Sequence, residues 1–192
     1  MGNEFSEKDG ASFLELARQS IREKLDPKKD GHPSPKEQFG KNITGGKRGI
    51  FVSLHKHGSL RGCIGNIEPV KPVFEGIVEN AKHAAFNDSR FQPLSQSELD
   101  ETKIEVSILT LPQKVNYLNS QDLLDKIHPG KDGVIIKKSF HQATFLPQVW
   151  KQLPRPEDFF SHLCKKAGLS STEWEKGDLE VSIYQVQSFE DE

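Results

Sequence analysis

The sequence predicts an α+β protein with mixed or antiparallel sheets and packed helices. Strand-like alternation and helix-like spacing of apolar residues both recur along the 192 residues. Their order has no regular βαβ rhythm, which would instead predict a doubly wound parallel sheet. The length suits one domain over residues 1–192, either undivided or in two lobes.

Each expected element rests on a local pattern. Residues 11–25 carry an apolar residue at every fourth position and end before Pro27, which predicts an amphipathic helix. Ser120 and Pro156 are residue types that begin helices, and Gly168 is a type that ends one. The expected helices are residues 11–25, 72–86, 121–127 and 157–167, and the expected strands are 49–55, 59–64, 103–110, 133–138, 141–146 and 178–188.

A long segment rich in proline, glycine and lysine, residues 26–48, separates the first helix from the first strand. Loops of this length inside a compact domain are often functional. Its lysines suit a basic flap over an anionic ligand. A solvated loop explains the same composition, and it is the interpretation we favour.

Composition and charge disfavour several functions. With 26 Lys and Arg against 28 Asp and Glu, the net charge is −2, which disfavours nucleic-acid binding without excluding it. The apolar runs are too short to span a bilayer and the N-terminus has no signal-peptide core, so we expect no membrane association. Two cysteines in a chain of this length indicate a reducing, cytoplasmic compartment.

The stretch LHKHGSLRGCIGN, residues 54–66, contains the most specific pattern. A three-residue loop, Lys56–Gly58, with Gly58 in the left-handed conformation separates an apolar face from a polar one. The apolar face then holds Ile50, Val52, Leu54, Leu60, Gly62 and Ile64, and the polar face holds Phe51, Ser53, His55, Ser59, Arg61 and Cys63.

Cys63 is the candidate reactive group of this hairpin. Arg61 lies two residues away on the same face, and a nearby cation favours the thiolate, the reactive form of cysteine. Gly62 and Gly65 remove side-chain bulk on either side, as strands do where another group approaches. With His55, these residues predict an activated thiol or an anion pocket. The alternative is a buried structural cysteine on a bulged strand.

Further candidates follow along the chain. Asp88 and Arg90 either pair on the surface, or Asp88 orients Arg90 toward a carboxylate or phosphate. Glu105 is either an exposed strand residue or a carboxylate that faces one of the two arginines. Gln148 lies on a turn in FLPQVW. Its amide would either hydrogen-bond to the edge of a ligand or pack at a corner of the chain.

No motif predicts a metal or a cofactor. Glu79 and His83 have no further ligand at metal-binding spacing. The turn HPGKDG, residues 128–133, offers backbone N–H groups to an anion but lacks the Lys-Ser/Thr ending of a P-loop. Cys164 lies in the middle of a helix, and we expect it in the core.

Together these stretches resemble the AMMECR-type domain family, which includes protein A of the AmmeMemoRadiSam system. The hexapeptide LRGCIG, residues 60–65, is the hallmark of that family. The stretches AAFNDSRFQPL, IEVSILT, PGKDGVII, FLPQVW and FFSHLCKKAGL follow in the family's order, so the resemblance covers about residues 10–189. The chain departs at Ser89, where the family often has proline, and at residues 141–143, where it often has glycine.

The resemblance implies an α+β fold of two unequal lobes around a cleft, with the signature residues near that cleft. It implies a cytosolic protein that works with a Memo-like protein and a radical SAM protein. It supplies no reaction, because enzymatic and nucleotide-related roles are only suggestions for the family.

Three functional hypotheses follow. In the first, an enzyme or enzyme subunit uses Cys63 as its nucleophile or radical-handling group, and Asp88 or Glu105 orients the arginines or acts as a base. In the second, the site binds a small anion or nucleotide without chemistry. In the third, the chain is an adaptor that offers its basic loop or an exposed Trp150 or Trp174 to a partner. The expected catalytic residues are Arg61, Cys63, Asp88 and Glu105, and the expected ligand-binding residues are His55, Arg61, Gly62, Gly65, Arg90 and Gln148.

Overall fold

A computed structural model describes residues 5–27 and 46–191 of the chain and divides it into two compact units. The first unit is Met1–Leu109 with Gln187–Glu192, and the second is Thr110–Val186. Each unit combines a four-stranded sheet with helices, which confirms the predicted α+β class. Most of the predicted basic loop, residues 28–45, lies outside the described residues.

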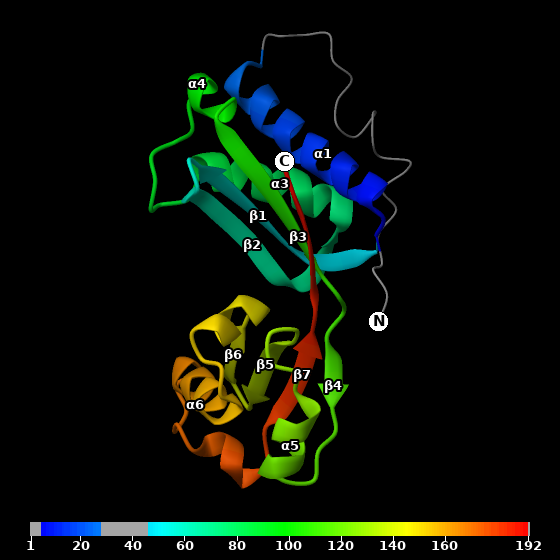
Figure 1. Ribbon diagram of the computed structural model, residues 1–192, viewed down its shortest axis with the longest axis vertical. Coiled ribbons are helices and arrows are strands. Elements are labelled where there is room, and N and C mark those ends of the chain that lie inside the picture. Colours follow the sequence, from blue (N-terminus) through cyan, green and yellow to red (C-terminus); the bar gives the residue numbers. More distant parts are fainter. Residues whose placement is uncertain (1–4, 28–45, 192) are drawn as a thin grey trace. The chain divides into compact units, whose positions relative to one another are not determined.

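The first unit packs two helices, α1 and α3, on one face of its sheet (Figure 1). The strands lie in the order β2-β1-β3-β8, and β1 is antiparallel to both of its neighbours. Ile50, Val52 and Leu54 alternate along β1 and are fully buried beneath the helices. The elements are α1 (Glu7–Leu25), β1 (Lys47–Lys56), β2 (Ser59–Pro72), α3 (Val73–Phe86), α4 (Gln96–Leu99), β3 (Thr102–Leu109) and β8 (Val186–Glu190).

The loop between β1 and β2 is shorter than predicted. Lys56 pairs with Ser59, so the loop has two residues, His57 and Gly58. Both have positive φ, 52° and 78°, as in the tight turns whose twist matches that of antiparallel strands. The predicted left-handed conformation of Gly58 is confirmed, and the predicted three-residue loop is wrong.

A bulge on β2 follows this turn. His55 pairs with Leu60 and Leu54 pairs with Gly62, so Arg61 is the extra residue of the bulge. The bulge restores the predicted separation of faces farther along the hairpin. It also turns Leu60 away from the core to 40% exposure, which corrects the predicted burial of that side chain.

The second unit has a sheet of order β4-β7-β5-β6. The neighbouring strands pair antiparallel throughout. Its elements are β4 (Gln113–Val115), α5 (Ser120–Lys126), β5 (Gly133–Lys138), β6 (His141–Phe145), a 3₁₀-helix (Pro147–Lys151), α6 (Pro156–Lys166), a second 3₁₀-helix (Glu173–Lys176) and β7 (Glu180–Tyr184).

The final predicted strand, residues 178–188, is two strands in two different sheets. β7 ends at Tyr184 and β8 begins at Val186. Between them, the Gln185 N–H donates to Thr110 Oγ1 at 2.9 Å, and the Thr110 N–H donates to the Gln185 carbonyl at 2.9 Å. The apolar alternation changes phase between Ile183 and Tyr184, and the single predicted strand overlooked that signal.

Both tryptophans are buried in the core of the second unit. Trp150 is 3% exposed and stacks on Phe159 with ring centroids 3.7 Å apart, and Trp174 is 6% exposed beside Phe160. The adaptor hypothesis took these side chains as exposed, and that expectation is wrong. Cys164 is fully buried in the same core, as predicted, and its burial raises the pKa of the thiol.

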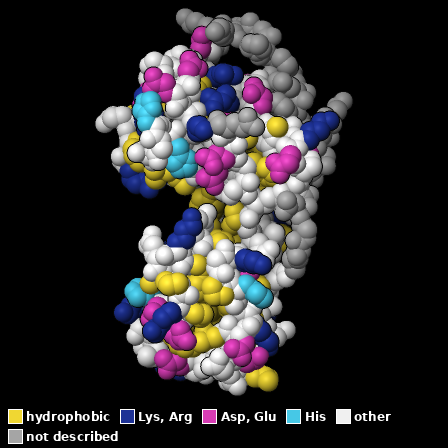
Figure 2. Space-filling model, viewed as in Figure 1, with side chains coloured by type: hydrophobic (Ala, Val, Ile, Leu, Met, Phe, Trp, Pro, Cys, Tyr) yellow, Lys and Arg dark blue, Asp and Glu magenta, His cyan; other side chains and the backbone are white. Residues whose placement is uncertain are grey.

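The described surface carries charges of both signs. Figure 2 shows basic and acidic side chains interspersed over the visible face, without a broad area of one sign. Within residues 5–27 and 46–191, no helix is long and apolar enough to cross a membrane.

Candidate functional site

The backbone of Cys63 is clamped by two side chains at the free edge of β2. The Cys63 N–H donates to Asp88 Oδ2 at 2.9 Å, and the Cys63 carbonyl accepts from Arg90 Nη2 at 3.3 Å. A neighbouring strand would supply the same acceptor and donor. The pair therefore satisfies the exposed edge of β2 at this residue and fixes Cys63 in place.

The Asp88 carboxylate is suited to orienting Arg90 and the Cys63 backbone rather than to accepting a proton. Its side chain is only 5% exposed, and Arg90 donates to it through Nε at 2.9 Å, Nη2 at 2.7 Å and the backbone N–H at 3.1 Å. These charge-assisted hydrogen bonds hold the pKa of Asp88 far below its usual value of 3.8. Arg90 keeps 54% of its side chain exposed, so it remains accessible to a ligand.

Arg61 is held by a second carboxylate. Its Nε and Nη2 donate to the two oxygens of Glu98 at 3.1 and 3.3 Å, and Nη2 also donates to the Gln92 carbonyl at 2.8 Å. The guanidinium carbons of Arg61 and Arg90 lie 5.8 and 5.5 Å from the centre of the Phe91 ring. The segment after α3 thus brings Arg90 to the Cys63 strand and supplies contacts to Arg61, which lies on that strand.

We expect the Arg61–Glu98 contact to weaken in acid. Hydrogen bonds from Arg61 and from Ser95 lower the pKa of Glu98 from 4.5 to about 2. Because the folded-state value is the lower one, the stabilisation is present above pH 4.5 and is lost as the pH falls toward 2. Glu98→Gln should lower the free energy of unfolding at pH 7 by about 1 kcal/mol.

Urea unfolding at pH 7 and pH 3 measures this contribution. The difference between wild type and Glu98→Gln should shrink at the lower pH. Glu101→Gln is the matched control, because that carboxylate is 54% exposed and should change stability by less than about 0.5 kcal/mol. An equal effect of the Glu98 change at both pH values would contradict the assignment.

The two glycines beside Cys63 have packing partners. A Cβ at Gly62 would lie 2.2 Å from the Ala84 carbonyl oxygen at the end of α3. A Cβ at Gly65 would lie 2.3 Å from the Phe51 ring. Both positions therefore need glycine for close approach within the unit, whether or not a ligand comes near.

The thiol lies on the polar face of the sheet, opposite the helices. Ser53 of β1 stands directly across from Cys63, and its hydroxyl donates to Sγ at 3.3 Å. Glu105 of β3 stands across from Ser53 on the other side and accepts from the Ser107 hydroxyl at 2.9 Å. The face thus presents a thiol, hydroxyls and a carboxylate in one row.

Two buried nitrogen atoms at this site lack a hydrogen-bond partner. They are His55 Nδ1 and Arg61 Nη1, and within the described ranges they are the only buried side-chain nitrogen or oxygen atoms in that state. His55 pairs across the strands with Leu60, the residue before Arg61. Both atoms therefore belong to residues predicted to bind a ligand, and they lie on neighbouring positions of the hairpin.

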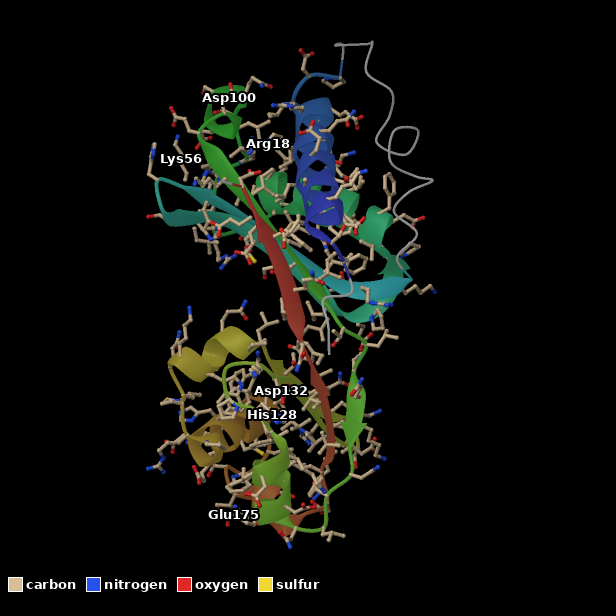
Figure 3. The ribbon with its side chains drawn as sticks, turned by 45° about the vertical axis from the view of Figure 1, so that its right-hand side comes forward. Arg18, Lys56, Asp100, His128, Asp132 and Glu175 are labelled. Carbon is tan, nitrogen blue, oxygen red and sulfur yellow. The ribbon has the colours of Figure 1, made fainter. Side chains whose placement is uncertain are left out.

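Gln148 and the HPGKDG turn belong to the second unit. Gln148 is exposed on the 3₁₀-helix Pro147–Lys151. In the turn, the Lys131 and Asp132 N–H groups both donate to the His128 carbonyl at 3.1 Å, so neither is directed to an anion. Figure 3 shows His128 beside Asp132, whose buried carboxylate accepts from the His128 backbone N–H at 2.8 Å.

Sequence reasoning missed Glu98 as the partner of Arg61. The pattern Ser95-x-x-Glu98 is a capping-box signal, and Ser95 donates to Glu98 through its N–H and its hydroxyl. That signal locates α4, but it carries no information on a contact 37 residues away. The alternation pattern assigns Ser53 to the same face as Cys63 but predicts no contact between the two side chains. For the described residues, no group of three or more His, Cys, Asp or Glu side chains could hold a metal ion.

Comparisons with known proteins agree with the resemblance seen in the sequence. A family model described as AMMECR1 matches residues 14–189. Protein MK0488 of Methanopyrus kandleri is 38% identical over 100% of this chain and 93% of its own length, and protein MJ0810 of Methanocaldococcus jannaschii is 36% identical over 95% and 90%. The crystal structure of uncharacterized protein PH0010 from Pyrococcus horikoshii has a TM-score of 0.79 and 31% identity, covering 98% of this chain and 94% of that one. None of these three names states an activity.

Proposed function

The chain belongs to the AMMECR1 family, and from that premise we propose that the first unit binds a small anionic molecule beside the reactive thiol of Cys63. The observation that carries the proposal is the pair of unpartnered buried nitrogens, His55 Nδ1 and Arg61 Nη1. Buried polar atoms without a partner cost free energy, and a ligand oxygen would relieve that cost. The half-exposed Arg90 guanidinium, which donates to the Cys63 carbonyl, adds a cation at the same residue.

The charges at the site favour a small ligand over a large polyanion. Asp88 and Glu98 neutralise Arg90 and Arg61, so the site offers directed hydrogen bonds with little net positive charge. A single carboxylate or phosphate group suits such a site. Cys63 then acts as the group that reacts with, or packs against, the bound molecule.

Two alkylating reagents that differ in charge test this proposal. In both iodoacetate and iodoacetamide, the Cys63 thiolate attacks the methylene carbon and iodide leaves, so the ratio of the two rates isolates recognition of the carboxylate. Relative to the unfolded chain, folded Cys63 should favour iodoacetate by about fivefold, as ~1 kcal/mol of electrostatic interaction gives. The Cys63→Ala variant provides the blank, because Cys164 is fully buried.

Arg90 variants separate charge from shape in this assay. Arg90→Gln should bring the iodoacetate preference down to the value of the unfolded chain, and Arg90→Lys should keep part of it. Arg22→Gln is the matched control, because Arg22 is 49% exposed on α1. A folded wild type with no preference for iodoacetate, or a preference that survives Arg90→Gln, would contradict the proposal.

A further inference from the structure

Ser53 is the residue that meets the Cys63 sulfur directly. The two residues face each other across β1 and β2, and the Ser53 hydroxyl donates to Sγ at 3.3 Å. The Cys63 N–H and carbonyl point away from β1 toward Asp88 and Arg90. Ser53 and Cys63 therefore form a non-hydrogen-bonded pair, the type in which opposite side chains come closest.

The same strand geometry directs Ser53 toward the thiol rather than toward Glu105. Backbone groups alternate along a strand, so the pair of Ser53 and Glu105 is the wider, hydrogen-bonded type. Glu105 instead accepts from Ser107 on its own strand. The Ser53 hydroxyl therefore donates its hydrogen bond to the Cys63 sulfur rather than to the Glu105 carboxylate.

We infer that Ser53 is a positioning residue for Cys63, whose hydroxyl hydrogen bond stabilises the thiolate and aims it along the polar face. The inference rests on the proposed function of the Cys63 site. A hydrogen bond to the charged form of an acid favours that form, and a thiolate accepts more strongly than a thiol. Ser53 therefore sets how much of Cys63 is reactive near neutral pH.

Other charged groups around the pair set the background. Arg90, which donates to the Cys63 carbonyl, is the cation at this edge, and Glu105 is a carboxylate one strand farther away. Substitutions at Ser53 leave these groups in place. A change in the pH midpoint of Cys63 alkylation therefore reports on the Ser53 hydroxyl. The titratable and charged groups nearby are His55 on β1, Arg61 on β2, Lys103 and Glu105 on β3, and Asp88 and Arg90 at the β2 edge.

The test is the rate of Cys63 alkylation by iodoacetamide from pH 5 to pH 10. Ser53→Ala should raise the midpoint by roughly one pH unit, as loss of one hydrogen bond to a charged group predicts. Ser53→Thr retains the hydroxyl and should restore the midpoint. Ser59→Ala, at an exposed position on β2, is the matched control and should leave it unchanged.

The outcomes separate this inference from the proposed function. A wild-type thiol that does not react up to pH 10 overturns both. A reactive thiol whose midpoint is the same in Ser53→Ala overturns the role of Ser53 alone. A shift in Ser53→Ala that Ser53→Thr fails to reverse also overturns it, because the cause is then packing.

Discussion

Replacing Asp88 with asparagine is expected to lower the free energy of unfolding of the first unit by about 2–4 kcal/mol. The carboxylate accepts the backbone N–H groups of Cys63 and Arg90 as well as the Arg90 guanidinium. An asparagine oxygen replaces only one of the two acceptors. The variant therefore leaves either the Cys63 N–H or the Arg90 N–H without its acceptor.

Hydrogen exchange and circular dichroism measure this effect. Exchange of the β2 peptide that contains Cys63 should accelerate, and the urea transition followed by far-UV circular dichroism should shift to lower urea. Both tryptophans lie in the second unit, so their fluorescence reports on that unit separately. Asp100→Asn, at an exposed position (Figure 3), should stay within about 0.5 kcal/mol of wild type.

The Asp88 contribution also has a defined pH dependence. Arg90 holds the folded-state pKa of Asp88 far below 3.8, so its stabilisation is present above about pH 4 and is lost as the pH falls further. Asp88→Asn should therefore lose less stability than wild type between pH 5 and pH 2. If the free energy of unfolding of both proteins falls by the same amount between pH 5 and pH 2, the Asp88 carboxylate does not stabilise the fold in this way.

Replacing Gly62 with alanine is expected to destabilise the first unit by about 3 kcal/mol, near the upper end of the usual cost of overpacking. The new Cβ would lie 2.2 Å from the Ala84 carbonyl oxygen, which is backbone and cannot rotate away. Relief requires the end of α3 to move from β2. Asp88 follows that end of the helix, so the same movement would loosen its hold on Cys63.

Gly46→Ala is the matched control for this variant. Its Cβ would meet the flexible end of the Arg48 side chain at 3.2 Å, which can shift at little cost. Urea unfolding should separate the two alanine variants clearly. Wild-type stability in Gly62→Ala would mean that α3 is not held tightly against β2. Cys63 alkylation in Gly62→Ala should lose its charge preference along with the clamp.

Local chemistry made much of the fold predictable. Four-residue apolar spacing located α1, although the Ser6–Asp9 capping box starts it at Glu7, before the predicted boundary. Alternation assigned Val52 to the core face and Cys63 to the polar face, because successive strand residues point to opposite sides. The sequence offered a bulged strand only as an alternative and did not place the bulge at Arg61, because Leu60, Gly62 and Ile64 alternate without a break through it.

The sequence by itself determined the family, the α+β class and the membership of one polar face, because these depend on residue types at short spacing. The tertiary structure alone decided the partner of Arg61, since Glu98 is distant from it in sequence. It also decided that Asp88 and Arg90 act on the backbone of Cys63. Such contacts depend on where the segment after α3 crosses the edge of β2, and long-range packing sets that path.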